Sequence, residues 1–221
     1  MTDTLTQLAH RLYDGDAQAV AQLTHAALSE GLTPEDVLNR GLVLGMQRVG
    51  VDFRAGELFI PEVLIAARAM HAGMAVLRPQ LASSGVPLAG KVVLGTVKDD
   101  LHDIGKNLVG MMLEGAGFEV IDLGIDTPPQ RFVEAVRRER PALVAISALL
   151  TTTMQGIVDT IEALTQAGMR DKVQIMVGGA PVTQAFASQI GADGYASDAA
   201  SAADLARSLI ESRRVMPGRA V

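Results

Sequence analysis

The chain of 221 residues lacks cysteine and tryptophan altogether, and aromatic residues make up only 3% of it. The absence of cysteine excludes disulfides, thiolate nucleophiles, cysteine-ligated zinc and iron–sulfur clusters. The scarcity of aromatic side chains leaves little surface on which a nucleic-acid base could stack. Positive charge is also in deficit, with 19 Lys and Arg against 25 Asp and Glu. We therefore expect no nucleic-acid partner.

Two further absences concern the location of the protein. The N-terminus lacks the basic start and apolar run of a signal peptide. We expect no apolar stretch to reach the ~18–20 residues that a membrane span requires. These features predict a cytoplasmic protein without a membrane partner.

Residues 1–88 are predicted to form a domain of four helices with short connections, which favours a four-helix bundle. Two helices are expected at 4–13 and 16–30, each followed by a glycine. A third follows Thr33-Pro34-Glu35-Asp36, where Thr33 is the expected N-cap and Pro34 the first helical residue. A fourth is expected from Pro61, with an apolar face formed by Val63, Ala67, Met70, Met74 and Leu77.

Residues 89–221 show a different pattern, after a Ser-, Gly- and Pro-containing linker at 83–90. Short runs of strand-forming residues occur at 92–97, 119–123, 143–147, 173–177 and 194–196. Helical stretches at 104–115, 130–140, 154–167 and 182–189 separate them. Strands that alternate with helices predict a five-stranded parallel sheet covered on both faces, in a flavodoxin-like (Rossmann-like) α/β domain.

Ligands of such domains bind beyond the carboxyl ends of the strands. The polar and glycine residues that follow the predicted strands should therefore gather at one edge of the sheet. They are Asp99, Asp100, Leu101, His102, Asp103 and Gly105 after the first strand, Ser147, Leu149, Thr151 and Thr153 after the third, Gly178 and Gly179 after the fourth, and Ala199 after the last.

His102 is the candidate metal ligand of this set. A lone histidine is usually an ordinary surface or core residue, but here Asp100 lies two positions before it. A metal-bound imidazole commonly donates its other N–H to a carboxylate, which fixes the tautomer. His102 cannot hold zinc by itself, since His10, His25 and His71 fall in the helical region. A single protein ligand suits a metal whose remaining positions are filled by a macrocycle.

The other members of the set have ordinary and ligand-binding interpretations. Gly105, Gly178 and Gly179 are either turn residues or positions where a bulky ligand passes close to the backbone. The hydroxyl residues after the third strand, Ser147, Thr151 and Thr153, are either good strand-end residues or neutral hydrogen-bonding groups in a pocket. No Walker-type or GxGxxG sequence is present, so a phosphate-binding loop is not expected.

The spacing of these residues resembles the cobalamin-binding signature of methionine synthase and its relatives. Asp100-x-His102-x-x-Gly105 is followed after 41 residues by Ser147-x-Leu149, and after 28 more by Gly178-Gly179. The helical half, at residues 45–63, is similar to the helical cap that covers the upper corrin face in methyl-transferring members. Residues 147–154 and 178–183 resemble still more the stand-alone corrinoid proteins of methylamine, methanol and methoxyarene methyltransferase systems.

The resemblance implies a cobalamin cofactor that alternates between methylcob(III)alamin and cob(I)alamin. It further implies that His102 replaces the cofactor's own lower base on cobalt, the base-off/His-on arrangement, with Asp100 and Thr153 continuing a hydrogen-bonded relay. Methionine synthases carry Ser where this chain has Thr153. The remaining members of the set would bind the cofactor: Ser147 and Thr151 at the nucleotide tail, Gly178, Gly179 and Ala199 along the channel of that tail, and Asp99, Leu101, Asp103, Gly105 and Leu149 as further contacts.

The cap residues Phe53 and Ile60 would lie over the methyl group, whereas Asn39 stands where some relatives carry an acidic residue. The implied partners are a substrate:corrinoid methyltransferase, a corrinoid:acceptor methyltransferase and a reductive activase, so the chain would not be a complete enzyme alone. Two other functions remain open: a cobalamin-dependent sensor or regulatory subunit, and a small subunit of an adenosylcobalamin mutase, which normally lacks the cap. The methyl donor and acceptor are not identified by the sequence.

Overall fold

The computed structural model describes residues 3–84 and 88–215. The chain forms two compact units. The first comprises the residues up to Leu88 together with Glu114–Gly117, and the second comprises Ala89–Leu113 and the residues from Phe118 onward. Of the expected linker at 83–90, residues 85–87 lie outside the described residues, whereas Ser83 and Ser84 still belong to a helix.

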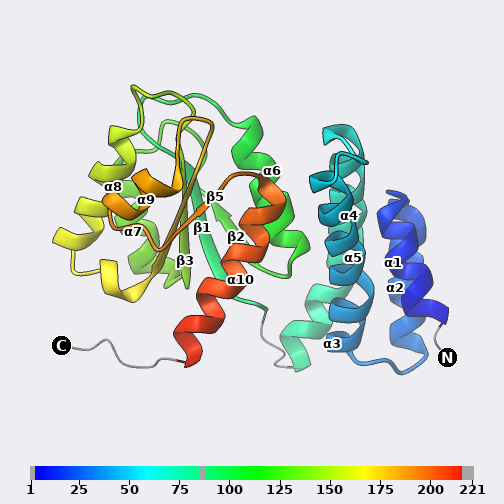
Figure 1. The fold of residues 1–221 in the computed structure, drawn as a ribbon. Helices are drawn as coiled ribbons and strands as arrows, with labels where there is room; N and C mark the ends of the chain where they lie inside the picture. Colours follow the sequence, from blue (N-terminus) through cyan, green and yellow to red (C-terminus); the bar gives the residue numbers. More distant parts are fainter. Residues whose placement is uncertain (1–2, 85–87, 216–221) are drawn as a thin grey trace. The chain divides into compact units, whose positions relative to one another are not determined.

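The first unit is helical, as predicted (Figure 1). Its elements are α1 (Asp3–Tyr13), α2 (Ala17–Ser29), α3 (Pro34–Asp36), the π-helical segment η1 (Val37–Val43), α4 (Leu44–Arg54) and α5 (Ile60–Ser84). Because α3, η1 and α4 follow one another without a break, the described residues of this unit form four helical rods. Thr33 caps the third rod as expected, since its side chain accepts a hydrogen bond from the backbone N–H of Asp36.

The π-helical segment was not predicted. It lies where the third rod packs closely on α1. A Cβ atom at Gly41 would come within 2.6 Å of the Leu8 side chain, and one at Gly45 within 2.8 Å of the Ala9 carbonyl oxygen. Glycine therefore permits a helix–helix approach that any other residue would prevent. π-Helical turns are usually single-turn insertions that have no simple sequence pattern.

Helix α5 carries the predicted apolar face, because Val63, Ala67, Met70, Met74 and Leu77 are all buried. The helix begins at Ile60 rather than Pro61, and Pro61 occupies its first turn, where the missing N–H costs nothing. By length and composition alone, Ile60–Leu81 is sufficiently long and apolar to cross a membrane, and 44% of its 18-residue apolar window is buried inside the protein. The expectation that no apolar stretch reaches that length was therefore wrong, although a core helix passes the same test.

The second unit contains the five-stranded sheet, and all of its paired strands are parallel. The strands are β1 (Lys91–Thr96), β2 (Glu119–Asp122), β3 (Leu143–Ser147), β4 (Gln174–Gly178) and β5 (Gly194–Ala196), in the order β2-β1-β3-β4-β5. The helices are α6 (Ile104–Gly115), α7 (Pro129–Glu139), α8 (Gln155–Gln166), the 3₁₀ turn η2 (Arg170–Lys172), α9 (Gln184–Gln189) and α10 (Ala199–Val215). The flavodoxin-like prediction is confirmed.

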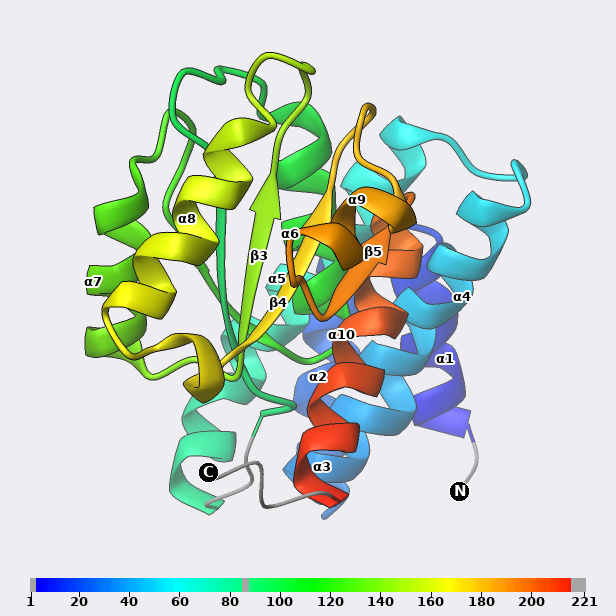
Figure 2. The ribbon, with the colours of Figure 1, turned by 60° about the vertical axis from the view of Figure 1, so that its left-hand side comes forward.

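Helices cover both faces of this sheet. Figures 1 and 2 show α7 and α8 on one side and α6 and α10 on the other. Side chains alternate between the two faces along each strand. Val93, Val144 and Ile175 accordingly pack in one core with buried residues of α7 and α8 such as Phe132 and Leu164. This burial on both faces explains why the strands are almost continuously apolar.

The strand order places a topological switch point between β1 and β3. From β1 the chain crosses to β2 on one side, whereas β3, β4 and β5 continue on the other side. The loops that follow β1 and β3 therefore diverge, and ligands of doubly wound sheets bind at such a switch point. Thr96 and Ser147, the last residues of the two strands, are directly paired. Both loops thus leave the sheet at the same level.

Candidate functional site at the carboxyl edge of the sheet

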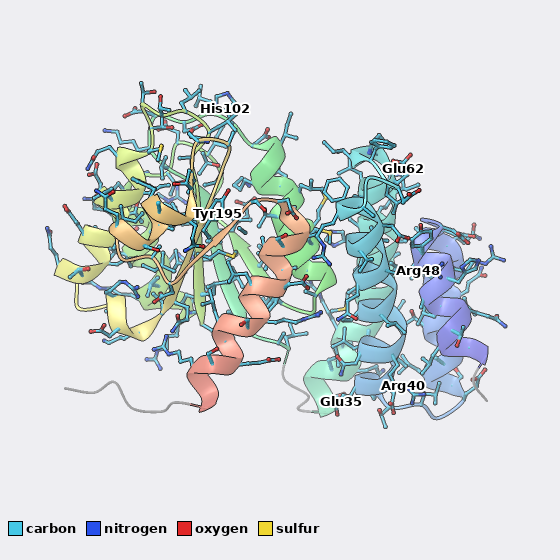
Figure 3. The ribbon with its side chains drawn as sticks, viewed as in Figure 1. Glu35, Arg40, Arg48, Glu62, His102 and Tyr195 are labelled. Carbon is cyan, nitrogen blue, oxygen red and sulfur yellow. The ribbon has the colours of Figure 1, made fainter. Side chains whose placement is uncertain are left out.

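His102 lies in the loop between β1 and α6, at the end of the α/β unit where the strands finish (Figure 3). Its backbone N–H donates to Asp100 Oδ1 over 3.1 Å, and its ring Nδ1 lies 2.7 Å from the same oxygen. The Asp100 side chain is fully buried, whereas the His102 side chain is 48% exposed. The carboxylate is therefore part of the protein interior, and the imidazole projects from it toward the surface.

The second oxygen of Asp100 joins this loop to the one after β3. Asp100 Oδ2 accepts hydrogen bonds from the backbone N–H of Leu149 and from Thr153 Oγ1, each over 2.7 Å. The buried Thr153 hydroxyl in turn accepts from the N–H of Leu150 over 3.3 Å. The chain His102–Asp100–Thr153 is thus continuous through hydrogen bonds, and it spans the switch point between β1 and β3.

The hydrogen bonds around Asp100 determine its charge. Burial alone would favour the neutral acid and raise its pKa. The donors Leu149, Thr153 and His102 outweigh burial and hold the pKa of Asp100 at about 2. At neutral pH the side chain is therefore a carboxylate that can only accept hydrogen bonds. The hydrogen bond between the two side chains must then be donated by His102 Nδ1–H, and in the neutral imidazole Nε2 is the nitrogen that has the lone pair.

The predicted glycines provide close approaches and open space. Gly179, which follows β4, has a φ of +127°, and a Cβ there would lie 1.8 Å from the Ala148 carbonyl oxygen. A Cβ at Gly178 would lie 3.1 Å from the Ala196 carbonyl oxygen. Gly105, beside His102 at the start of α6, has nothing within 4 Å of its Cβ position. The loops after β3 and β4 thus pack backbone against backbone, and the surface at Gly105 is unobstructed.

The other predicted residues of the α/β unit lie at the same carboxyl edge. Ser147 is half-buried at the end of β3, Thr151 is exposed, and Ala199 is buried as the first residue of α10. No hydrogen bond joins Ser147 or Thr151 to Asp100 or His102 within residues 88–215. Asp99, Leu101 and Asp103 are exposed around His102, and Leu149 is 39% exposed beyond Ser147.

Phe53 and Ile60 belong to the helical unit. Phe53 is half-buried near the end of α4, and Ile60 is 42% exposed at the start of α5. Asn39 is exposed within the π-helical segment. Their roles above the cofactor remain predictions.

A buried lysine that the sequence analysis did not single out supports the first turn of α6. Lys106 is 3% exposed and forms an ion pair with Asp122 at the end of β2. Its Nζ also donates to Asn107 Oδ1 over 2.7 Å. A buried charge is tolerated only when it is paired. The signal that could have indicated this pair was that Lys106 is the only charged residue between Ile104 and Leu113 in the sequence.

The donor set fits a metal held mainly by a larger organic group. Among the described residues no group of three or more His, Asp or Glu side chains is arranged to hold a metal ion. His102 instead offers one oriented nitrogen, with large apolar side chains exposed nearby at Leu101, Ile104 and Leu150. Such a surface, together with the open position at Gly105, accommodates a broad and partly apolar ligand. The residues present therefore fit a corrinoid.

Comparison with known proteins agrees with this fit. Residues 90–204 match the model of a family described as a B12 binding domain, and residues 4–78 match a second family with the same description. Trimethylamine corrinoid protein 1 of Methanosarcina acetivorans is 44% identical over 199 residues, which are 89% of this chain and 92% of that protein. The dimethylamine corrinoid protein of Methanosarcina barkeri is 45% identical over 210 residues, covering 94% of this chain and 98% of that protein.

A solved structure gives the same result. In the methanol:cobalamin methyltransferase complex of Methanosarcina barkeri, one chain superposes with a TM-score of 0.82 and 32% identity. The superposition covers 95% of this chain and 80% of that one. The likeness therefore extends over both units.

Proposed function

Because this chain belongs to the family of B12-binding corrinoid proteins, we propose that it carries a methyl group on its cobalamin between two methyltransferases, with His102 as the protein ligand of cobalt. Cobalamin is the cofactor of the family, and when bound it supplies a cobalt centre that accepts and releases a methyl group. The protein supplies the binding surface, the oriented ligand and the control of protons.

The Asp100–His102 pair is the observation that carries this proposal. The buried carboxylate of Asp100 accepts a hydrogen bond from His102 Nδ1–H over 2.7 Å. The ring is thereby held in one tautomer and orientation, with Nε2 as the ligating atom. A hydrogen bond to a carboxylate also makes the imidazole a stronger donor toward a metal. An ordinary surface histidine would not need a fully buried carboxylate for its partner.

Thr153 completes the relay on the far side of Asp100. Its hydroxyl donates a hydrogen bond of 2.7 Å to Asp100 Oδ2 and so keeps that oxygen from turning toward His102. When Nε2 is not ligating it can take up a proton, and the carboxylate of Asp100 stabilises the resulting imidazolium. We propose that this proton uptake favours release of the ligand, so that the same three residues support both the bound and the released state of His102.

The neighbouring loops are proposed to hold the rest of the cofactor. Gly178 and Gly179 would line the channel of the nucleotide tail with Ala199, and Ser147 and Thr151 would donate hydrogen bonds to the tail. The half-buried and exposed hydroxyls of these two residues are available for such contacts. Around His102 we propose that Asp99, Leu101, Asp103, Gly105 and Leu149 contact the corrin.

The partners are inferred from the relatives. Two relatives are named as trimethylamine and dimethylamine corrinoid proteins, and the superposed chain comes from a methanol:cobalamin methyltransferase complex. We therefore propose a substrate:corrinoid methyltransferase acting on a methylated amine or on methanol, and a second methyltransferase that passes the methyl group to an acceptor. A reductive activase would restore the cofactor after accidental oxidation.

Electron paramagnetic resonance of the Co(II) form tests the proposed ligand. Protein labelled with ¹⁵N and loaded with unlabelled cofactor should show splitting from one ¹⁵N nucleus, which identifies a protein nitrogen on cobalt. His102→Ala should remove that splitting, whereas His25→Ala, at an exposed position of α2, should retain it. A signal from the cofactor's own ¹⁴N base, or a ¹⁵N signal that persists in His102→Ala, would refute the assignment.

A further inference from the structure

The backbone of the His102 loop is held by a residue of β1 that lies outside the Asp100–His102–Gly105 motif. Thr96, the last residue of β1, is fully buried, and its Oγ1 donates to the His102 carbonyl oxygen over 3.0 Å. This hydrogen bond joins the two ends of the loop from 97 to 101, because it links the strand residue before the loop to the proposed ligand after it. The peptide group that follows His102 is fixed without any contribution from Asp100.

A second residue, Asp126, holds the other side of the same loop. It lies between β2 and α7, and its Oδ1 accepts from the Asp99 N–H over 2.7 Å. Its own N–H donates to the Asp100 carbonyl oxygen over 3.0 Å. One residue thus makes two hydrogen bonds of opposite direction to consecutive residues of the His102 loop.

The backbone at this contact is in an unfavourable conformation. Asp99 has a φ of 65° and Asp126 a φ of 48°, and among the described residues only Arg140 is a further non-glycine residue with positive φ. Aspartate tolerates the left-handed region better than most residues, but it is still less favourable there than glycine. Two facing residues in this region indicate a conformation that the surrounding structure imposes.

The segment that carries Asp126 is itself fixed on the end of β1. Thr96 donates its N–H to the Gly124 carbonyl oxygen and accepts at its own carbonyl from the Thr127 N–H, both over 3.0 Å. Thr96 therefore contacts the Asp126 segment through its backbone and His102 through its side chain. Asp99 is exposed, so water could satisfy its N–H, and the bond to Asp126 is not required to satisfy a buried group.

We propose that Thr96 and Asp126 are positioning residues for His102. The proposal rests on His102 being the cobalt ligand. The two residues hold the backbone on both sides of the Asp100–His102 pair before the cofactor binds, while the loop after β3 holds only the Asp100 carboxylate. Preorganisation of this kind lowers the cost of ordering the loop on binding.

Two matched pairs of variants test this in the full-length chain. Thr96→Val removes the hydroxyl at nearly constant volume, and Thr96→Ser retains it. Asp126→Ala removes the acceptor, and Asp126→Asn retains an oxygen for the Asp99 N–H. In the cofactor-free protein, the Val and Ala variants should increase hydrogen exchange of the amides at 99–103 by about 5-fold, as expected for one lost hydrogen bond. The Ser and Asn variants should stay close to the unsubstituted protein.

The same four variants are then loaded with cobalamin and examined as Co(II) by electron paramagnetic resonance with ¹⁵N-labelled protein. The ratio of species with a protein nitrogen to species without one should fall about 5-fold in Thr96→Val and Asp126→Ala. The Ser and Asn variants should restore it. Melting temperatures identify any variant that has lost its fold, and the exposed position of Asp126 keeps one pair informative should Thr96→Val unfold.

The outcomes separate the two proposals. An unsubstituted protein without a protein nitrogen on cobalt would overturn both. A normal signal there, with an unchanged ratio in Thr96→Val and Asp126→Ala, would overturn the positioning role and leave His102 as the ligand. Faster hydrogen exchange at 99–103 without any change in the ratio of the two Co(II) species would also overturn the positioning role. Equal losses in the Ser and Val variants, or in the Asn and Ala variants, would assign the effect to packing rather than to these hydrogen bonds.

Discussion

Replacement of Asp100 by Asn should destabilise the cofactor-free protein in a manner that depends on pH. The Asp100 carboxylate is fully buried and accepts hydrogen bonds from Leu149, Thr153 and His102. Its pKa is about 2, against an ordinary value of 3.8. At about 1.4 kcal/mol per pH unit, this difference makes the ionised side chain contribute about 2 kcal/mol to folding.

The direction of the pH dependence follows from the lowered pKa of Asp100. The folded protein releases the Asp100 proton more readily than the unfolded chain does, so the contribution is fully present above the unfolded pKa of about 4. It is lost as the pH falls toward 2. Asn cannot titrate, and its NH₂ group would have to face hydrogen-bond donors to which the carboxylate is an acceptor. Asp100→Asn should therefore lower the free energy of unfolding by about 2–3 kcal/mol at pH 7.

Urea unfolding followed by circular dichroism at pH 7, 5, 4 and 3 measures this difference. The difference in unfolding free energy between the two proteins should narrow as the pH falls below 4. Asp103→Asn, at an exposed position of the same loop, is the control and should change the free energy of unfolding by less than about 0.5 kcal/mol. A gap below about 1 kcal/mol at pH 7, or one that does not narrow in acid, would show that the hydrogen bonds do not stabilise the ionised form as argued.

Three other predictions follow from the site and the units. Gly179→Ala should lower the free energy of unfolding by several kcal/mol and abolish cobalamin binding, because the added Cβ would lie 1.8 Å from a carbonyl oxygen. Gly124→Ala, where φ is positive but the space is open, should lower it by only about 1–2 kcal/mol. Equal losses in urea unfolding would contradict the predicted clash. Phe53→Ala and Ile60→Ala should leave the melting temperature nearly unchanged and speed photolysis of bound methylcobalamin. The reverse result would make both ordinary core residues. Residues 90–221 should fold alone and bind cobalamin, and an unfolded product that cofactor cannot rescue would disprove that boundary.

Local sequence patterns were sufficient for most of the secondary structure. The strands expected at 143–147 and 194–196 and the helix expected at 104–115 coincide with β3, β5 and α6. Strand β2 ends one residue earlier than expected, and β1 and β4 are each shifted by one residue. Apolar periodicity and glycine or proline at element ends act over a few residues, so the sequence displays them directly. The π-helical segment escaped prediction because it depends on the packing of Gly41 and Gly45 against α1.

The candidate site divides in the same way. The pair of Asp100 and His102 is local in the chain, and the sequence alone determined it, together with the family and the cofactor. The donors to Asp100 from Leu149 and Thr153 lie 49 and 53 residues away. The spacing of the motif placed these residues at the same edge, but only the pairing of Thr96 with Ser147 in the parallel sheet brings the two loops to hydrogen-bonding distance.

Only the tertiary structure shows the contacts of Thr96 and Asp126 with the His102 loop. A threonine at the end of a strand and an aspartate in a loop are common, and no short-range pattern distinguishes them. The contacts of Asp126 with the His102 loop arise because β1 and β2 are neighbours, so that the segment after β2 runs along the end of β1. The contact of Thr96 with the His102 carbonyl arises from the fold of the loop back onto the end of its own strand. The sequence singled out the group that we propose as the metal ligand. Hydrogen bonds between segments distant in the chain decided how that group is held, because such bonds depend on strand order and register.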